Sequence, residues 1–150
     1  MFSEFIEEQT LLFVALVIII AMLVYSYLGD RLSGFKSVNV GEATRLFNDG
    51  AFMLDVRASS EYKEGFIGDA KNISVSDLSS KMNLLPKDKE KPIVVYCLSG
   101  ARSANAASKL VKAGYTQVVN LSGGINAWKA AGLPVVKAKS KKAKKKAAVK

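Results

Sequence analysis

The stretch that decides the fold is "VVYCLSGARSANAASKL", from Val94 to Leu110, which contains the only cysteine of a chain of 150 residues. Two β-branched residues and a tyrosine lead into Cys97, as is typical of the end of a buried strand. A short loop with serine and glycine follows, and the run that begins at Ala101 is rich in residues that favour a helix. The sequence therefore predicts a strand, a tight loop and a helix, with the single thiol where strand and loop meet.

Short apolar segments alternate with helical segments on both sides of this stretch. We expect strands at 37–40, 51–57, 70–74, 91–97 and 116–122. We expect helices or helical turns at 41–50, 59–65, 74–85, 101–114 and 123–132. Ser76 is the predicted N-cap of the helix at 74–85, and Pro86 ends it. This alternation predicts an α/β fold, a parallel sheet with helices on both faces.

The N-terminal part of the chain contains an apolar run, with no charge from Leu11 to Leu28. At about 1.5 Å per residue, a helix over 10–29 would cross a hydrocarbon core of about 30 Å. Tyr25 and Tyr27 lie near one end of it, where aromatic residues gather at a membrane surface. We expect a transmembrane helix, and a core helix of a soluble protein is the alternative.

Charges on either side of this run bear on its processing and its orientation. Glu4, Glu7 and Glu8 precede it, whereas a cleavable signal peptide begins with basic residues and ends at a small-residue cleavage site. Arg31 and Lys36 follow it. Because cytoplasmic flanks carry the excess of basic residues, we expect a single-pass protein with its N-terminus outside and its soluble domain in the cytoplasm, in a bacterial inner membrane. A single cysteine agrees with a reducing compartment.

The net charge of +9 comes from the C-terminus. Residues 137–150 hold eight lysines and no acidic residue, and the rest of the chain has 14 basic and 13 acidic residues. We expect a disordered tail from Lys137 to Lys150. It is either a solvated extension or a contact for anionic lipid, for RNA or the ribosome, or for a membrane protein. The predicted parts are a short acidic segment (1–9), a transmembrane helix (10–29), a linker (30–36), a globular domain (37–136) and the tail (137–150).

The chain has no histidine, which excludes Ser-His-Asp and Cys-His catalysis and the histidine-based zinc motifs. Any chemistry at Cys97 must therefore ionise the thiol without an imidazole base. Unpaired N–H groups at a helix N-terminus can hold a thiolate or another anion, and Arg102 adds a positive charge. Cys97 is the candidate catalytic residue. The candidate residues for binding substrate are those of the loop: Leu98, Ser99, Gly100, Ala101, Arg102 and Ser103. The alternative is a buried cysteine that acts as a small hydrophobic residue.

Four segments resemble the rhodanese family, in order and at family-like spacing. They are "FMLDVR" (52–57), "EYKEGFIGDAKNI" (61–73), "VVYCLSGARSA" (94–104) and "GGINAWKAAGLPV" (123–135). The resemblance covers nearly all of 37–136 and implies a sulfurtransferase of rhodanese-like fold. Cys97 would take the sulfane sulfur of a thiosulfate-like donor as a persulfide and pass it to a thiol or to cyanide. The resemblance implies no cofactor, and we expect no metal.

Loop length and three further residues refine this expectation. Four residues separate Cys97 from Arg102, whereas phosphatases that resemble the same fold have five, which favours sulfur over phosphate. The family's usual histidine in the second segment is Phe66 here, and we interpret that turn as mainly structural. Asp55 and Arg57 lie on one strand face, either near the mouth of the loop or, as we favour, as a structural ion pair. We expect Trp128 in the core, with its N–H bonded.

Two classes of function remain open. The first is a membrane-tethered sulfurtransferase or persulfide carrier. The second is a membrane-bound adaptor in which the fold and the basic tail bind partners and Cys97 is incidental. The intact "CLSGARS" loop favours the enzyme.

Overall fold

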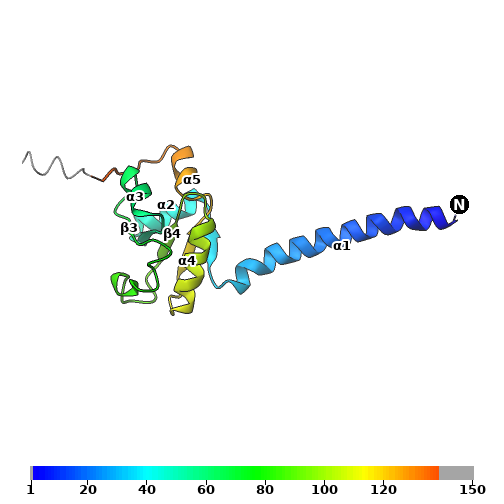
Figure 1. Cartoon of the computed structure of the whole chain (residues 1–150), viewed down its shortest axis with the longest axis horizontal. Helices are drawn as coiled ribbons and strands as arrows, with labels where there is room; N and C mark the ends of the chain where they lie inside the picture. The colour runs from blue at the N-terminus through cyan, green and yellow to red at the C-terminus, as the bar shows by residue number, and fades with distance from the viewer. Residues whose placement is uncertain (1, 139–150) are drawn as a thin grey trace, which may run out of the picture. The chain divides into compact units, whose positions relative to one another are not determined.

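The computed structural model describes residues 2–138, and the chain divides into two compact units, residues 1–34 and a second that begins at Phe35. The first unit is one helix, α1 (Phe2–Leu32), drawn in blue in Figure 1. It ends inside the linker predicted over 30–36. The basic tail predicted over 137–150 lies outside the described residues from 139 onward.

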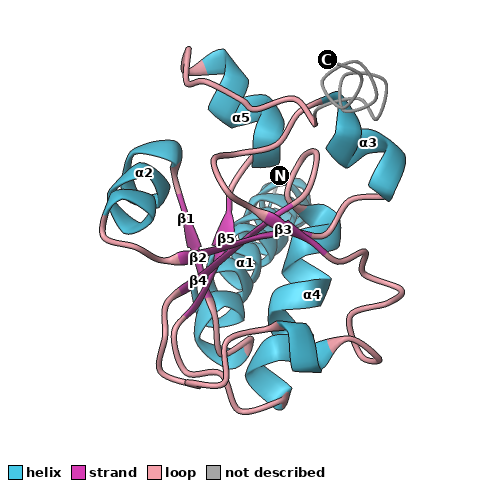
Figure 2. Cartoon of the chain, turned by 90° about the vertical axis from the view of Figure 1, so that its left-hand side faces the viewer, coloured by secondary structure: helices cyan, strands magenta, loops and turns pink. Residues whose placement is uncertain are grey.

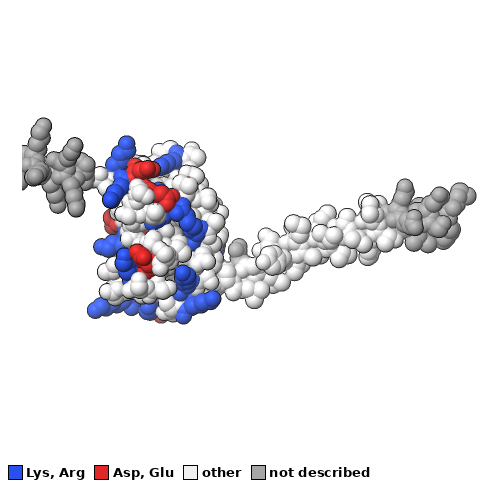
Figure 3. All heavy atoms as spheres, in the orientation of Figure 1, with Lys and Arg blue, Asp and Glu red and all other residues white. Residues whose placement is uncertain are grey.

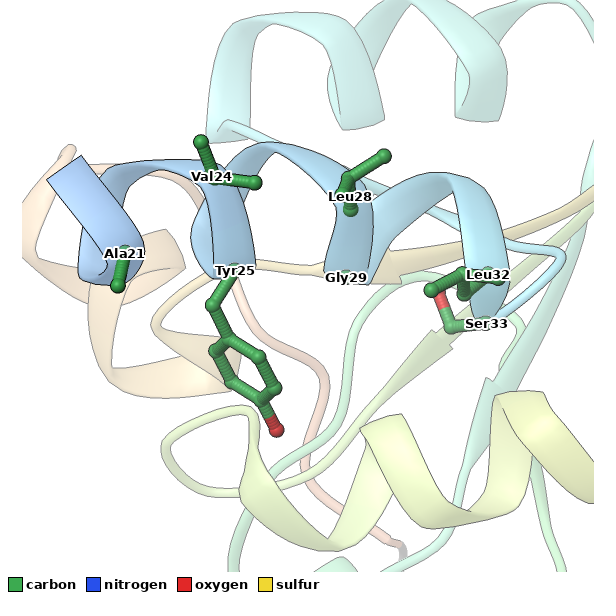
Figure 4. A pocket seen from close by; sticks show the side chains of 7 residues that line it. All are labelled: Ala21, Val24, Tyr25, Leu28, Gly29, Leu32 and Ser33. Atoms are coloured by element: carbon green, nitrogen blue, oxygen red, sulfur yellow. The ribbon is translucent and has the colours of Figure 1, made fainter.

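Helix α1 contains a candidate membrane span, Gln9–Gly29, with a mean hydropathy of 2.8. None of this stretch is buried within the protein, and its described side chains carry no charge along the surface in Figure 3. Figure 4 shows that Val24 and Leu28 point to one side of the helix while Ala21 and Tyr25 point to another, so apolar and aromatic groups surround its last turns. The helix is long and apolar enough to cross a membrane, and a signal sequence would satisfy the same criteria.

The second unit contains a sheet of five parallel strands in the order β1-β5-β4-β2-β3. The strands are β1 (Lys36–Val38), β2 (Phe52–Asp55), β3 (Lys71–Asn72), β4 (Ile93–Tyr96) and β5 (Val118–Leu121). The helices are α2 (Val40–Asn48), α3 (Ser59–Glu64), α4 (Ala101–Lys112) and α5 (Gly124–Ala130). Because the strands are parallel, their carboxyl ends meet at one edge of the sheet, where open α/β sheets bind ligands.

Helices cover both faces of this sheet, and strand β4 lies in its interior with every residue buried. Ile93 and Val95 point into the core under α4, whereas Val94 and Tyr96 point into the core under α2 and α5. This alternation is the two-residue period of a strand. Figure 2 shows the sheet between α4 on one side and α2 and α5 on the other, so the predicted α/β fold is confirmed.

The prediction of a helix over 74–85 is wrong. This segment forms a series of turns and a short 3₁₀ helix, η1 (Met82–Leu84). The hydroxyl of Ser76, the predicted N-cap, lies 3.0 Å from the hydroxyl of Ser74 and does not cap a helix. The N–H of Asp77 bonds the carbonyl of Ser74 at 3.0 Å, a bond that closes a turn. The serine-rich segment favours turns because serine hydroxyls compete with a helix for hydrogen bonds.

Candidate functional site

The loop that holds Cys97 begins directly after β4 and leads into α4. Gly100 is the N-cap of α4 and has a φ of 109°, a conformation that glycine adopts readily. This turn brings the N–H of Gly100 to 3.1 Å from Cys97 Sγ. The predicted strand, loop and helix are thus confirmed, and the thiol faces the first turn of the helix.

Ser103 provides the second contact to the sulfur. Its hydroxyl oxygen lies 3.4 Å from Cys97 Sγ, and Ser103 is fully buried on the first turn of α4. The same oxygen lies 2.6 Å from Oδ1 of Asn120, a buried residue on β5. Asn120 Nδ2 in turn donates to the carbonyl oxygen of Gly100 at 3.3 Å. Loop, helix and neighbouring strand are therefore joined around the sulfur.

These contacts determine the acidity of Cys97. Burial raises the pKa of the thiol, but hydrogen bonds from the Ser103 side chain and from the N–H groups of Ser103, Gly100 and Ser99 lower it more. The net result is a pKa below the ordinary cysteine value of 9.0. Since a thiolate is the nucleophilic form of cysteine, the loop activates the thiol with no imidazole.

Helix α5 holds the loop from the other side. The N–H groups of Ile125 and Asn126, in its first turn, donate to the carbonyls of Cys97 at 2.9 Å and of Leu98 at 3.2 Å. Gly124 has a φ of 58°, and a Cβ at this position would lie 2.6 Å from the carbonyl oxygen of Leu98. Only glycine allows the helix to approach the loop this closely. Gly124, the second glycine of "GG" in the fourth sequence segment, therefore allows α5 to bond the loop.

Arg102 lies on the outer side of the loop and is paired with Glu61 of α3. Its Nη1 and Nη2 donate to Glu61 Oε2 and Oε1, both at 2.9 Å. The side chain of Arg102 is 44% exposed and that of Glu61 is 29% exposed. The hydrogen bond from Arg102 lowers the pKa of Glu61 to about 2. Arg102 also interacts electrostatically with Cys97, so the expected positive charge acts on the thiol, and it has a carboxylate as its partner.

Asp55 and Arg57 form a second ion pair at the end of β2. Arg57 Nη2 lies 2.6 Å from Asp55 Oδ2, and the side chains are 3% and 0% exposed. Arg57 Nη2 also donates to the carbonyl of Gly65, just after α3, at 2.6 Å. The ion pair predicted between Asp55 and Arg57 is therefore present. Its burial and its bond to Gly65 favour the structural role over a place at the mouth of the loop.

The two aromatic residues singled out in the sequence pack within the domain. Phe66 stacks on Tyr62, with ring centroids 4.2 Å apart, and its backbone pairs with that of Val136. These contacts favour a structural role for the turn in which it replaces the family's histidine. Trp128 is 3% exposed and donates its indole N–H to the carbonyl of Pro134 at 3.0 Å. The core position predicted for Trp128 is confirmed.

The structure brings Cys97, Gly100 and Ser103 together, and it leaves Leu98, Ser99, Ala101 and Arg102 exposed around them. Sequence reasoning missed two residues of the site. Asn120 could have been found from the sequence, because its amide side chain interrupts the apolar run of β5. Glu61 lies in a segment that resembles the family, but nothing in the sequence indicated that it pairs with Arg102, 41 residues away.

Known proteins with similar sequences include enzymes named for sulfur transfer. A sulfurtransferase of Allochromatium vinosum is 42% identical over 84 residues, which cover 56% of this chain and 77% of that protein. The thiosulfate sulfurtransferase GlpE of Coxiella burnetii is 35% identical over 97 residues, 64% of this chain and 89% of that protein. The uncharacterized protein YibN of Escherichia coli is 30% identical over 138 residues, 91% of this chain and 96% of that protein.

Solved structures have the same fold. A rhodanese-related protein of Thermoplasma volcanium superposes with a TM-score of 0.62 at 34% identity, over 68% of this chain and 98% of that one. The polysulfide-sulfur transferase homodimer of Wolinella succinogenes also gives 0.62, at 25% identity, over 81% of this chain and 92% of that one. A model of the rhodanese-like domain matches residues 39–131. The chain therefore belongs to the rhodanese-like domain family.

Proposed function

We propose that this protein is a membrane-tethered sulfurtransferase that carries sulfane sulfur on Cys97 as a persulfide. The observation that carries the proposal is the environment of Cys97 Sγ, with the N–H of Gly100 at 3.1 Å and the Ser103 hydroxyl at 3.4 Å. Such donors stabilise an anionic sulfur atom, in the thiolate and in the persulfide alike.

The reaction has two steps, and each exchanges one sulfur–sulfur bond for another. The Cys97 thiolate attacks the outer sulfur of thiosulfate, the bond within thiosulfate breaks, and sulfite leaves with its electron pair. The product is a persulfide whose negative charge lies on the outer sulfur, among the loop N–H groups. A thiolate acceptor then attacks that outer sulfur, takes it as a new persulfide, and releases Cys97 as the thiolate. Neither step needs a base within the protein, which suits a chain without histidine.

Exposed loop residues define how donor and acceptor approach. Cys97 is only 1% exposed, whereas Leu98 is 40% exposed and the side chain of Arg102 is 44% exposed. Arg102 would bind the anionic end of the donor, in competition with Glu61. The relatives named for thiosulfate and polysulfide support a small anionic sulfur donor.

The membrane tether rests on α1. Its apolar stretch Gln9–Gly29 is long enough to span, and the acidic residues before it do not fit a cleavable signal. The relative YibN aligns over 138 residues of this chain, which is too long to leave out this stretch. With basic residues only after the span, the soluble domain would face the cytoplasm, and the tail beyond Lys137 could contact anionic lipid, RNA or the ribosome, or membrane proteins there.

An adaptor remains the second candidate, and two observations favour it. Cys97 is only 1% exposed, and the guanidinium of Arg102 already has a carboxylate partner, as would suit a fold kept only for binding partners. The two candidates differ in one consequence, because only the enzyme releases sulfite.

The decisive experiment supplies thiosulfate and an acceptor thiol to the purified full chain and measures sulfite. We expect sulfite in molar excess over protein for the natural chain and none above background for Cys97→Ser. Ser79→Ala, a change at an exposed serine outside the loop, is the matched control and should retain turnover. Equal sulfite with and without Cys97 would contradict the proposal, and no sulfite from any variant would favour the adaptor.

The tether is tested separately in cells. We expect the chain to remain in carbonate-washed membranes with its full mass of 16.2 kDa, whereas a signal sequence would be removed. In a Cys97→Ser background, Ser3→Cys should react with a membrane-impermeant maleimide in intact cells. Labelling only after the membrane is permeabilised would reverse the orientation.

A further inference from the structure

Asn120 is a buried amide on a strand that is otherwise apolar. It is 6% exposed, lies between Val119 and Leu121 on β5, and pairs in register with Val95 of β4. An amide in such a place costs free energy unless its polar atoms are bonded. Both of its ends bond the sulfur-binding loop region, through Ser103 and through Gly100. Its position therefore points to a role in the site.

The hydroxyl of Ser103 has three acceptors in reach and only one proton. Its oxygen lies 2.6 Å from Asn120 Oδ1, 3.0 Å from the carbonyl oxygen of Gly100 and 3.4 Å from Cys97 Sγ. A serine hydroxyl donates one hydrogen bond at a time. The shortest of the three distances leads to Asn120, so the proton lies on that bond while Cys97 is a neutral thiol. The thiol can then donate its own proton to a lone pair of Ser103.

The orientation of the Asn120 amide is fixed by Gly100. Its Nδ2 faces the carbonyl oxygen of Gly100 at 3.3 Å. If the amide were turned, its Oδ1 would face that carbonyl, which places two acceptors together. Asn120 therefore presents an acceptor, not a donor, to Ser103.

We propose that Asn120 is a positioning residue that competes with the Cys97 sulfur for the hydroxyl proton of Ser103. When Cys97 ionises, Ser103 turns to the sulfur and leaves Asn120 Oδ1 unpaired in the core, which disfavours the free thiolate. In the persulfide the charge lies on the outer sulfur, so Ser103 can return to Asn120. This second part rests on the proposed function. Asn120 thus raises the free energy of the free thiolate relative to the thiol and to the persulfide, and so favours conversion of the thiolate to persulfide.

Charged groups near the loop are the same whether or not Asn120 is present. Arg102 on α4 interacts electrostatically with Cys97, with its partner Glu61 on α3 and with Asp55 on β2, and Asp55 is paired with Arg57. The described residues of β5 carry no charge. A change in the acidity of Cys97 on replacing Asn120 therefore reports the Ser103 hydrogen bond.

The test is the pH dependence of alkylation of Cys97 by iodoacetamide in the full chain, where this is the only cysteine. Asn120→Leu removes the nearer of the two acceptors that compete with the sulfur, so the pKa of the thiol should fall by about 0.5 to 1 pH unit, whereas Ser103→Ala should raise it. The double variant should match Ser103→Ala, because in this proposal Asn120 changes the acidity of Cys97 through that hydroxyl and not through its bond to Gly100. Asn120→Val, the residue found at 118 and 119, should repeat the fall.

A rise or no change in the pKa of Asn120→Leu and Asn120→Val overturns the inference, as does a double variant that keeps the full effect of the Asn120 change. Should neither variant fold, NMR of the natural chain provides the measurement. The side-chain amide signals of Asn120 must then shift with the titration of Cys97, and signals that stay constant overturn the inference. No sulfur donor is used, so these outcomes are independent of whether the chain forms a persulfide.

Discussion

Two arginine–carboxylate pairs lie near the same loop, and they differ in exposure. Asp55 and Arg57 are 0% and 3% exposed, whereas Glu61 and Arg102 are 29% and 44% exposed. The buried pair joins the end of β2 to the turn at Gly65, and the exposed pair joins α3 to the first turn of α4, next to the Cys97 loop. The same kind of contact, an arginine paired with a carboxylate, thus contributes differently at the two positions.

Burial decides what each pair contributes. A buried charge cannot return to water when its partner is lost, so the domain depends on the Asp55–Arg57 pair. An exposed charge is hydrated either way, so the Glu61–Arg102 pair adds little stability, and in the proposed function it opens to admit an anionic donor. We therefore expect changes at the first pair to alter folding and changes at the second to alter function.

The largest effect should follow from Asp55→Asn. The change leaves the Arg57 guanidinium buried without a counter-charge, so we expect a loss of about 3 to 5 kcal/mol in the free energy of unfolding. Urea unfolding of the full chain measures it through the fluorescence of Trp128, the only tryptophan. Asp69→Asn, on an exposed aspartate, is the control and should stay near wild type. A loss below about 1 kcal/mol for Asp55→Asn would contradict a structural role for the buried pair.

A smaller, functional effect should follow from Glu61→Gln. The neutral amide keeps the shape of the side chain and frees the charge of Arg102 for an anionic donor. We expect the thiosulfate concentration at half-maximal sulfite release to fall by about twofold to fivefold, with little change in stability. Glu64→Gln, on the same short helix, removes the same charge at another position and should change it less. If the two variants behave alike, general charge and not the Arg102 pair controls donor binding.

The smallest effect concerns the acidity of Cys97. Its pKa lies below 9.0, so the alkylation rate should rise with pH to a plateau and reach half of that plateau below pH 9.0. Glu61, with a pKa of about 2, is ionised throughout this range and adds no step of its own. Glu61→Gln leaves Arg102 without a counter-charge, which favours the thiolate and should lower the midpoint by a few tenths of a pH unit. A midpoint at or above 9.0, or a rise in the variant, would contradict the electrostatic account.

The sequence predicted the parts of the fold that depend on local pattern. The apolar run into Cys97, the turn at Gly100 and the helix from Ala101 are short-range features, and all three are found. The segment at 74–85 was mispredicted because Ser76 and Pro86 fit the two ends of a helix, whereas the hydroxyls of Ser74 and Ser76 bond each other. Side-chain hydrogen bonds of this kind compete with helix formation in a way that periodicity does not reveal.

The site was predictable only as far as it is local. Cys97, Gly100 and Ser103 lie within seven residues, and their contacts follow from one loop. Asn120 and Glu61 reach the loop from β5 and α3, so their roles depend on the order of strands and on the packing of α3. Those long-range contacts give Arg102 its carboxylate partner and give the Ser103 hydroxyl its nearest acceptor.

The central claim is that Cys97 carries sulfane sulfur, and the most direct test is the intact mass of the full chain after incubation with thiosulfate. We expect one adduct of about 32 Da, a single sulfur atom, that is absent in Cys97→Ser and is lost when a thiol acceptor is added. An unmodified mass, or an adduct that persists in Cys97→Ser, would contradict the account.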